Sequence, residues 1–142
     1  MATYLAHIDG GARGNPGPAG WGAVIADSSG ARLTELKGAL PHATNNVAEY
    51  HGLVAALGWC AERGATVVHI RSDSLLLVQQ MRGVYKVKHA GLKPLYGRAR
   101  LLAHGIGTVT FEHVRREANT DADRLANEAM DDAAATRERE NS

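Results

Sequence analysis

The chain has 142 residues, of which 44% are hydrophobic and 22% charged, and 16 Lys and Arg against 15 Asp and Glu give a formal net charge of +1. This balance is typical of one folded domain and excludes a disordered chain, and no apolar run approaches the roughly 18 residues that a membrane span needs. The single cysteine, Cys60, excludes an internal disulfide, and the segment from Met1 to Asp9 has no signal-peptide pattern, so we expect a cytoplasmic protein.

Strand-forming sequences open the chain. The predicted strands are Thr3–Asp9, Gly20–Asp27 and Arg32–Leu40, and Ser28-Ser29-Gly30 forms the turn between the last two. We expect these strands to form an antiparallel meander. A glycine-rich surface loop is expected between Gly10 and Gly20.

Helical spacing of apolar residues begins at Asn46 and continues to Glu62, after which Gly64 ends the helix. A strand, two helices, a strand and a final helix follow, with predicted ranges Thr66–Ser72, Ser74–Met81, Leu92–His104, Thr108–Arg115 and Thr120–Ala135. This order predicts an α/β fold: a mixed five-stranded sheet, antiparallel in its first three strands and flanked by helices. We expect residues 1–135 to form one domain and residues 136–142 a frayed or linker-like tail.

Positive charge gathers in one part of the chain. A net charge of +1 does not by itself indicate nucleic-acid binding, because phosphate neutralisation usually leaves a clear basic excess. In residues 71–100, however, the only acid is Asp73, and the basic residues are Arg71, Arg82, Lys86, Lys88, Lys93, Arg98 and Arg100. This segment is a candidate nucleic-acid surface; the alternative is a solvated lysine face without a ligand.

Four acids stand out by their positions, namely Asp9, Glu49, Asp73 and Asp123. Asp9 and Asp73 end predicted strands, and both emerge at one edge if those strands are parallel neighbours in the sheet. Glu49 and Asp123 begin helices, on faces that otherwise carry apolar residues. Each acid also has a local alternative, as a turn residue or as part of a helix cap.

Carboxylates that meet without a neighbouring Lys or Arg need a cation. Oxygen ligands alone suit a hard divalent ion, Mg²⁺ or Mn²⁺. Zinc is disfavoured, because Cys60 has no partner and the seven histidines show no ligand spacing. Two hard cations about 3.5–4 Å apart stabilise the entering and leaving oxygens of a phosphoryl displacement. The four acids therefore predict metal-dependent hydrolysis of a phosphodiester.

Four segments of the chain resemble the type 1 ribonuclease H family, in the same order. They read IDGGARGNPG from residue 8, TNNVAE from residue 44, SDS from residue 72 and NTDADRLA from residue 119, and the resemblance covers residues 3–131. It implies the mixed sheet of that fold and endonucleolytic hydrolysis of the RNA strand of RNA–DNA hybrids, leaving 3′-hydroxyl and 5′-phosphate ends. It also implies that two metal ions are bound by the family's catalytic carboxylates, here Asp9, Glu49, Asp73 and Asp123.

The same resemblance assigns substrate contacts. Asn15 and Asn46 sit where the family places side chains that reach base edges in the minor groove of the hybrid. Thr44 sits where the family has part of a phosphate-binding pocket for the DNA strand. The wide, shallow minor groove of such hybrids favours contacts of this kind. The remaining expected substrate contacts are Gly10, Gly11, Asn45, Lys86 and Lys88.

Two features of many family members are missing. The basic handle between the helix after the third acid and the last strand is reduced to Tyr85–His89. We therefore expect a weaker grip on the substrate, or a grip that Lys86, Lys88 and Lys93 alone provide. The flexible-loop histidine before the last helix is absent from residues 115–119, where Arg116, Glu117 or Asn119 could replace it. The chain therefore resembles the compact subset of the family.

Two alternatives remain. One is another nuclease on the same fold: proofreading-type exonucleases place Asp-x-Glu on the first strand, but here Gly11 occupies the glutamate position, and integrases use three acids rather than four. The other is a catalytically silent hybrid-binding module, which is disfavoured because uncompensated acids would repel phosphate. No protein partner can be inferred from the sequence.

Overall fold

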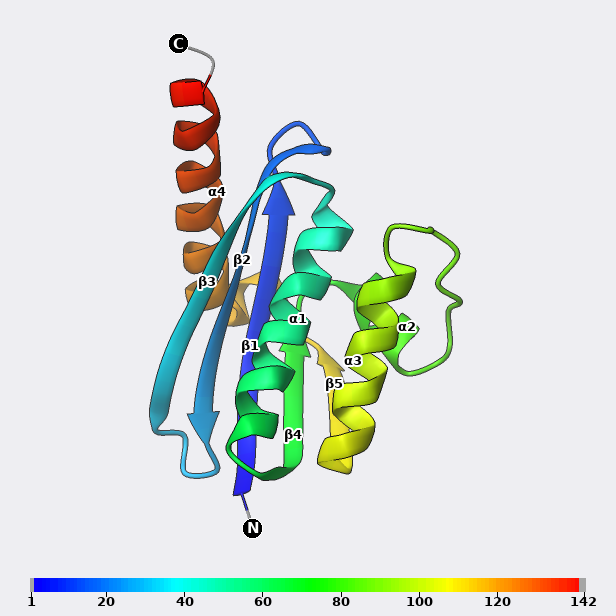
Figure 1. Ribbon diagram of the computed structural model, residues 1–142. Helices are drawn as coiled ribbons and strands as arrows, with labels where there is room; N and C mark the ends of the chain where they lie inside the picture. The colour runs from blue at the N-terminus through cyan, green and yellow to red at the C-terminus, as the bar shows by residue number, and fades with distance from the viewer. Residues whose placement is uncertain (1, 141–142) are drawn as a thin grey trace.

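The computed structural model describes residues 2–140 and contains a five-stranded sheet with helices on both faces (Figure 1). The strands are β1 (Ala2–Ala12), β2 (Gly17–Asp27), β3 (Arg32–Ala43), β4 (Ala65–Ser72) and β5 (Thr108–His113). The helices are α1 (Asn45–Glu62), α2 (Leu75–Met81), α3 (Lys93–Ile106) and α4 (Thr120–Glu140), and a 3₁₀ turn, η1, spans Arg116–Ala118.

β1 lies at the centre of the sheet, whose strand order is β3-β2-β1-β4-β5. The first three strands are antiparallel, and β4 runs parallel to both β1 and β5. These pairings confirm the predicted mixed sheet. The parallel pairing of β1 with β4 ends at Ile8 and Ser72. The next residue along the chain in each case, Asp9 and Asp73, therefore emerges at the same edge of the sheet.

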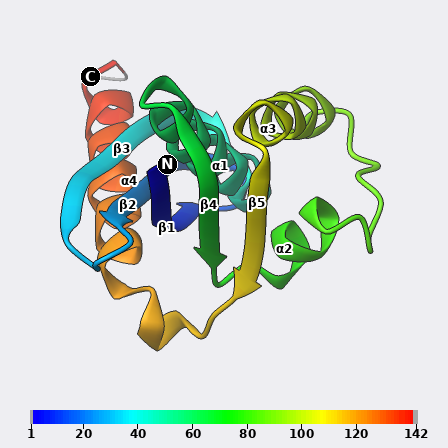
Figure 2. The same cartoon turned by 90° about the horizontal axis from the view of Figure 1, so that it is seen from below.

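Helices α1 and α3 cover one face of the sheet, and α4 covers the other over β1, β2 and β3 (Figure 2). The main core lies between α1 and the sheet. Its fully buried side chains include Leu53 and Leu57 of α1 and Ile8, Val68 and Ile70 of the strands. Burying each of these side chains stabilises the fold by about 1.5–3 kcal/mol. This packing fixes α1 against β1, close to the edge where Asp9 emerges.

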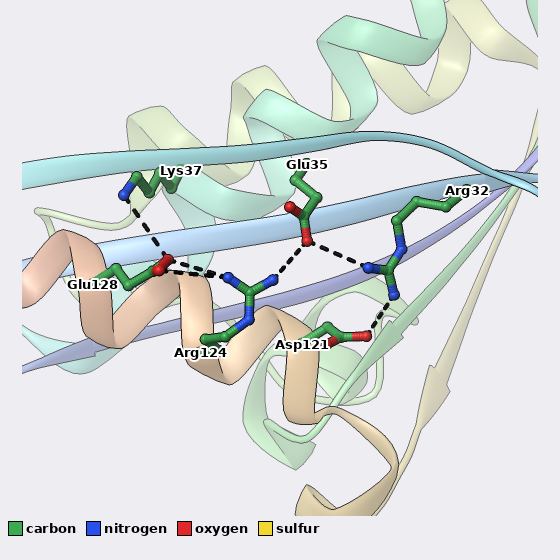
Figure 3. A network of polar contacts seen from close by, with 6 residues as sticks. All are labelled: Arg32, Glu35, Lys37, Asp121, Arg124 and Glu128. Carbon is green, nitrogen blue, oxygen red and sulfur yellow. Dashed lines mark hydrogen bonds and ion pairs between the residues drawn. The ribbon is translucent and has the colours of Figure 1, made fainter.

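α4 is held against the sheet by close packing and by ion pairs. A Cβ atom at Gly22 of β2 would lie 2.6 Å from the Leu125 Cβ, so only glycine allows α4 to approach this strand so closely. At the surface, Arg124 bonds Glu35 of β3 with an Nη2–Oε2 distance of 2.7 Å, and Arg32 pairs with Asp121 (Figure 3). These pairs are half exposed, so each contributes at most about 1 kcal/mol, but together they orient α4 on β3.

Several predicted boundaries were wrong. β1 continues to Ala12 and β2 begins at Gly17, so the predicted loop from Gly10 to Gly20 shrinks to residues 13–16. Most of the glycines there belong to paired strands. β3 also extends beyond its predicted end, to Ala43, and β5 stops at His113 rather than Arg115.

α4 runs through Glu140, past its predicted end at Ala135, so the tail is helical as far as the structure describes it. The Thr136 hydroxyl donates to the Asp132 carbonyl at 3.0 Å, and Arg137 and Arg139 lie favourably near the negative end of the helix dipole. Asn141 and Ser142 lie outside the described residues. None of the helices within residues 2–140 combines the length and apolar character of a membrane span.

Candidate active site

The four acids predicted from the sequence line one pocket of about 730 Å³ at the edge of the sheet. Asp9 and Asp73 reach it from β1 and from the residue after β4, where the parallel pairing of these strands ends. Glu49 reaches it from the beginning of α1, and Asp123 from the first turn of α4. The four acids therefore share one pocket, but the prediction that Asp9 ends its strand was wrong, because β1 continues to Ala12.

A glycine allows α1 to carry Glu49 so close to β1. A Cβ atom at Gly10 would lie 2.4 Å from the backbone nitrogen of Glu49 and 2.5 Å from the carbonyl carbon of Ala48. Backbone atoms cannot give way at such distances, so any larger residue would push α1 outward. Glycine is therefore required at position 10 by the packing of α1 on β1, and not by the turn that the Asp-Gly sequence suggests.

The local alternatives for three of the acids do not apply. Thr44 caps α1 by accepting a hydrogen bond from the Val47 N–H at 3.2 Å, which leaves Glu49 outside the cap. Ser74, and not Asp73, caps α2. α4 begins at Thr120, so the capping-box position three residues after Asn119 is Ala122, and Asp123 lies one residue beyond it. These carboxylates are therefore not committed to holding helix ends.

Two of the acids hold protons more tightly than carboxyl groups usually do. Burial raises the pKa of Asp9 to about 8, with further contributions from the charge of Asp73 and from a hydrogen bond with Asp123. Burial also raises the pKa of Glu49 to about 7; a hydrogen bond with Ser74 opposes this shift, and the charge of Asp73 adds to it. Crowded, buried carboxyl groups with raised pKa values are typical of sites that bind a cation.

The donor set suits a hard divalent cation in its chemistry, since it consists of carboxylate oxygens. Within residues 2–140, however, no three His, Cys, Asp or Glu side chains are placed so that they could hold an ion as they stand. The acids approach one another in pairs, Asp9 with Asp73 and Asp123, and Glu49 with Asp73.

Within residues 2–140, one basic side chain forms an ion pair with an acid of the cluster. The Arg116 Nε lies 3.8 Å from the Asp73 Oδ2. The side chain of Arg116 is 84% exposed, so this contact is weak and does not occupy the carboxylate. Arg116 and Glu117 both line the pocket, whereas Asn119 is buried, does not line it, and donates to a backbone carbonyl. Of the three residues considered as substitutes for the loop histidine, Asn119 is therefore excluded.

His113 is a pocket residue that the sequence did not reveal. It ends β5, lines the pocket, and its Nε2 lies 3.2 Å from the backbone carbonyl oxygen of Asp73. Because β5 was predicted to end at Arg115, the resemblance placed the family's loop histidine within residues 115–119, where this chain has none. The parallel pairing of β5 with β4, in register at Ser72 and His113, is the signal that would have placed it at the site edge.

A second pocket of about 250 Å³ brings four of the predicted substrate contacts together, with His89 and Leu92 as further lining residues. The four are Asn15, Thr44, Asn45 and Asn46. Two of them also shape the backbone: Asn45 Oδ1 accepts the Ala12 N–H at 2.7 Å, and Asn15 Oδ1 accepts the Asn45 N–H at 2.9 Å. His89 was not predicted, because its loop carries no helical or strand pattern that would place it.

The other predicted contacts divide between the carboxylate pocket and the surface. Gly10 and Gly11 line the carboxylate pocket. Lys86 and Lys88 are exposed in the segment between α2 and α3 and line neither pocket. Their expected role in gripping the substrate stays a prediction.

The chain is similar to known proteins along most of its length. A family model described as reverse transcriptase-like matches residues 7–129. A bifunctional protein of Mycobacterium tuberculosis is 54% identical over 128 residues, which are 89% of this chain and 35% of that protein. The chain thus spans about a third of the length of that curated relative.

Solved structures share both the fold and much of the sequence. The N-terminal ribonuclease H domain of a Mycobacterium tuberculosis protein, solved as a fusion with maltose-binding protein, gives a TM-score of 0.93 at 48% identity and covers 96% of this chain and 99% of that one. Ribonuclease H1 of Halobacterium salinarum gives 0.87 at 40% identity, with coverage of 92% and 98%. LC11 ribonuclease H1, in complex with an RNA/DNA hybrid, gives 0.87 at 43% identity, with coverage of 92% and 99%.

Proposed function

The chain belongs to the reverse transcriptase-like family and has the ribonuclease H fold, and on this premise we propose that it hydrolyses the RNA strand of RNA–DNA hybrids. One observation carries the proposal: four carboxylates from separate segments line a single pocket at the sheet edge. The similarity to an enzyme solved with an RNA/DNA hybrid supports the substrate class. The expected products carry 3′-hydroxyl and 5′-phosphate ends.

The carboxylates Asp9, Glu49, Asp73 and Asp123 would hold two divalent cations, Mg²⁺ or Mn²⁺. When bound, these cations would supply the positive charge that stabilises the entering and leaving oxygens at the scissile phosphate. Asp9 and Glu49 have raised pKa values, so each releases its proton as it becomes a ligand. Metal binding near pH 7 should therefore release protons into solution.

The second pocket would hold a phosphodiester of the DNA strand. Thr44 accepts the Val47 N–H through its hydroxyl oxygen, which leaves the hydroxyl proton free to be donated to a phosphate oxygen. Asn15 uses its carbonyl oxygen to order the start of α1, so its NH₂ group would face the substrate. Such contacts select shape and backbone position rather than sequence, as expected for A-form-like hybrids.

The test is a cleavage assay on three substrates of one sequence, an RNA–DNA hybrid, a double-stranded RNA and a double-stranded DNA, each with Mg²⁺, with Mn²⁺ and with a chelator. We expect cleavage of the labelled RNA strand of the hybrid alone, and only with metal. Metal-independent cleavage, or equal cleavage of double-stranded RNA, would overturn the proposal. Binding of the hybrid without cleavage under every condition would favour the silent binding module.

A further inference from the structure

Asn119 is a buried polar residue directly before α4. Its exposed fraction is 1%, and its side-chain NH₂ group donates to the Ile8 backbone carbonyl at 2.9 Å. Among the described residues, its side-chain oxygen Oδ1 accepts no hydrogen bond. A buried polar atom without a partner is costly, and an apolar side chain of similar volume would avoid that cost. The hydrogen bond to Ile8 is therefore the one contact that an asparagine makes here and an apolar side chain would not.

Two hydrogen bonds of Asn119 end beside the carboxylate pocket. Ile8 directly precedes Asp9 and is the last residue of β1 that pairs with β4. The backbone carbonyl of Asn119 accepts the N–H of Asp123 at 3.0 Å. One residue thus joins the part of β1 that carries Asp9 to the helical turn that carries Asp123. Asp123 also contributes to the raised pKa of Asp9, as expected for two acids that line the same pocket.

We propose that Asn119 is a positioning residue, which holds Asp9 and Asp123 at the separation at which both can reach one divalent cation. Asn119 does not line the carboxylate pocket, so it acts through Ile8 and through the backbone of Asp123 rather than on the cation or the substrate. Supporting groups of this kind tune metal affinity by orienting the ligands. The inference rests on the proposed function and deepens it.

Two variants separate this role from a general contribution to folding. Asn119→Ser keeps a residue type that favours a helix start, but its hydroxyl is too short to reach Ile8. Asn119→Leu keeps the buried volume and removes the hydrogen bond, so it stays informative if the serine variant does not fold.

The matched control is Gln80→Ala. Gln80 is another buried amide, 5% exposed, which accepts the Tyr50 hydroxyl at 2.8 Å and does not line the carboxylate pocket. Removing it costs a buried hydrogen bond whose partner, Tyr50, directly follows Glu49, but this bond joins no two of the four acids.

The measurement is a titration of Mn²⁺ into the metal-free protein, followed by Tm, with hybrid cleavage measured in parallel. In both Asn119 variants we expect the Mn²⁺ concentration at half of the Tm rise to increase about ten- to a hundredfold. We also expect kcat to fall while KM for the hybrid is unchanged. Gln80→Ala should lower Tm and leave the Mn²⁺ midpoint where it is in the unsubstituted protein.

An unchanged Mn²⁺ midpoint in the folded Asn119 variants would overturn the inference, and so would an equal shift in Gln80→Ala. If the unsubstituted protein shows neither an Mn²⁺-dependent rise in Tm nor cleavage, the proposed function fails together with the inference. If it shows both, and the Asn119 variants match it, the proposed function stands and this inference alone fails.

Discussion

Asp9 is a buried acid whose ionisation the folded protein strongly opposes. It is 8% exposed, it follows the last paired residue of the β1–β4 ladder, and it is close to both Asp73 and Asp123. Ionising it without a cation places negative charge in a crowded, poorly solvated position. The folded protein therefore resists this ionisation, and the resistance is measurable as a pH dependence of stability.

Metal-free protein should lose stability as the pH rises from about 4 to about 8. Folding raises the pKa of Asp9 from 3.8 to about 8 and that of Glu49 from 4.5 to about 7. A raised pKa stabilises the fold below the ordinary value, and this contribution disappears as the pH rises through the folded value. Tm measured in the presence of a chelator checks the prediction. The fall should be smaller in Asp9→Asn, and a Tm that rises over this range would contradict it.

His89 is expected to contact the substrate from the second pocket. His89→Ala should raise KM for the hybrid about three- to tenfold, the effect of removing one hydrogen bond, and leave kcat unchanged. His104→Ala is the control, because His104 lies in the last turn of α3 and lines neither pocket. Steady-state kinetics at saturating Mg²⁺ measure both constants. Equal KM values in the two variants would remove His89 from the substrate site.

At the scale of the element, the site depends on how closely α1 lies against β1. Gly10→Ala should destabilise the protein by about 1–3 kcal/mol, because its Cβ would overlap backbone atoms of α1, and should also reduce cleavage by displacing Glu49. Gly58→Ala, within the same helix, meets no atom within 4 Å and should stabilise by up to about 1 kcal/mol. Chemical denaturation measures both; a neutral Gly10→Ala would contradict the packing argument.

The elements could be predicted because their apolar spacing is regular, and the four acids because they sit at the ends of the predicted elements with no local partner in the sequence. The predictions that were wrong concern the residues at which strands begin and end. Gly11 and Gly20 fall within or at the edge of the predicted loop, although they pair with each other across β1 and β2. His113 and His89 were missed because segments far along the chain bring them to the pockets. His113 is placed by the pairing of β5 with β4, and His89 lies beside the start of α1. Neither relation leaves a local pattern in the sequence.

At the scale of the whole molecule, charge is nearly balanced but unevenly distributed. On the α4 side, Arg32, Glu35, Arg124 and Glu128 neutralise one another across β3 and α4 (Figure 3). The segment between α2 and α3 carries lysines at positions 86 and 88 without an acid between them. The net positive surface available to a polyanion is therefore expected beside the second pocket, rather than on α4.

A double variant tests this expectation. Lys86→Ala with Lys88→Ala should weaken hybrid binding more at low salt than at high salt. It should also reduce the slope of log K against log salt by about 0.7–0.9 for each phosphate that a lysine no longer neutralises. Lys37→Ala is the control, since Lys37 lies 3.9 Å from Glu128 and from Asp132 on the α4 side. An unchanged salt slope in the double variant would show that these lysines do not grip the substrate.

The measurement that tests the central claim most directly is a crystal structure of the protein soaked in Mn²⁺, with anomalous scattering used to locate the ions. We predict anomalous density inside the carboxylate pocket, at ligand distances of about 2.0–2.2 Å from Asp9 and from at least two of the other three acids. An empty pocket at saturating Mn²⁺, or ions bound only elsewhere on the molecule, would contradict the claim that these four carboxylates form a metal-dependent catalytic site.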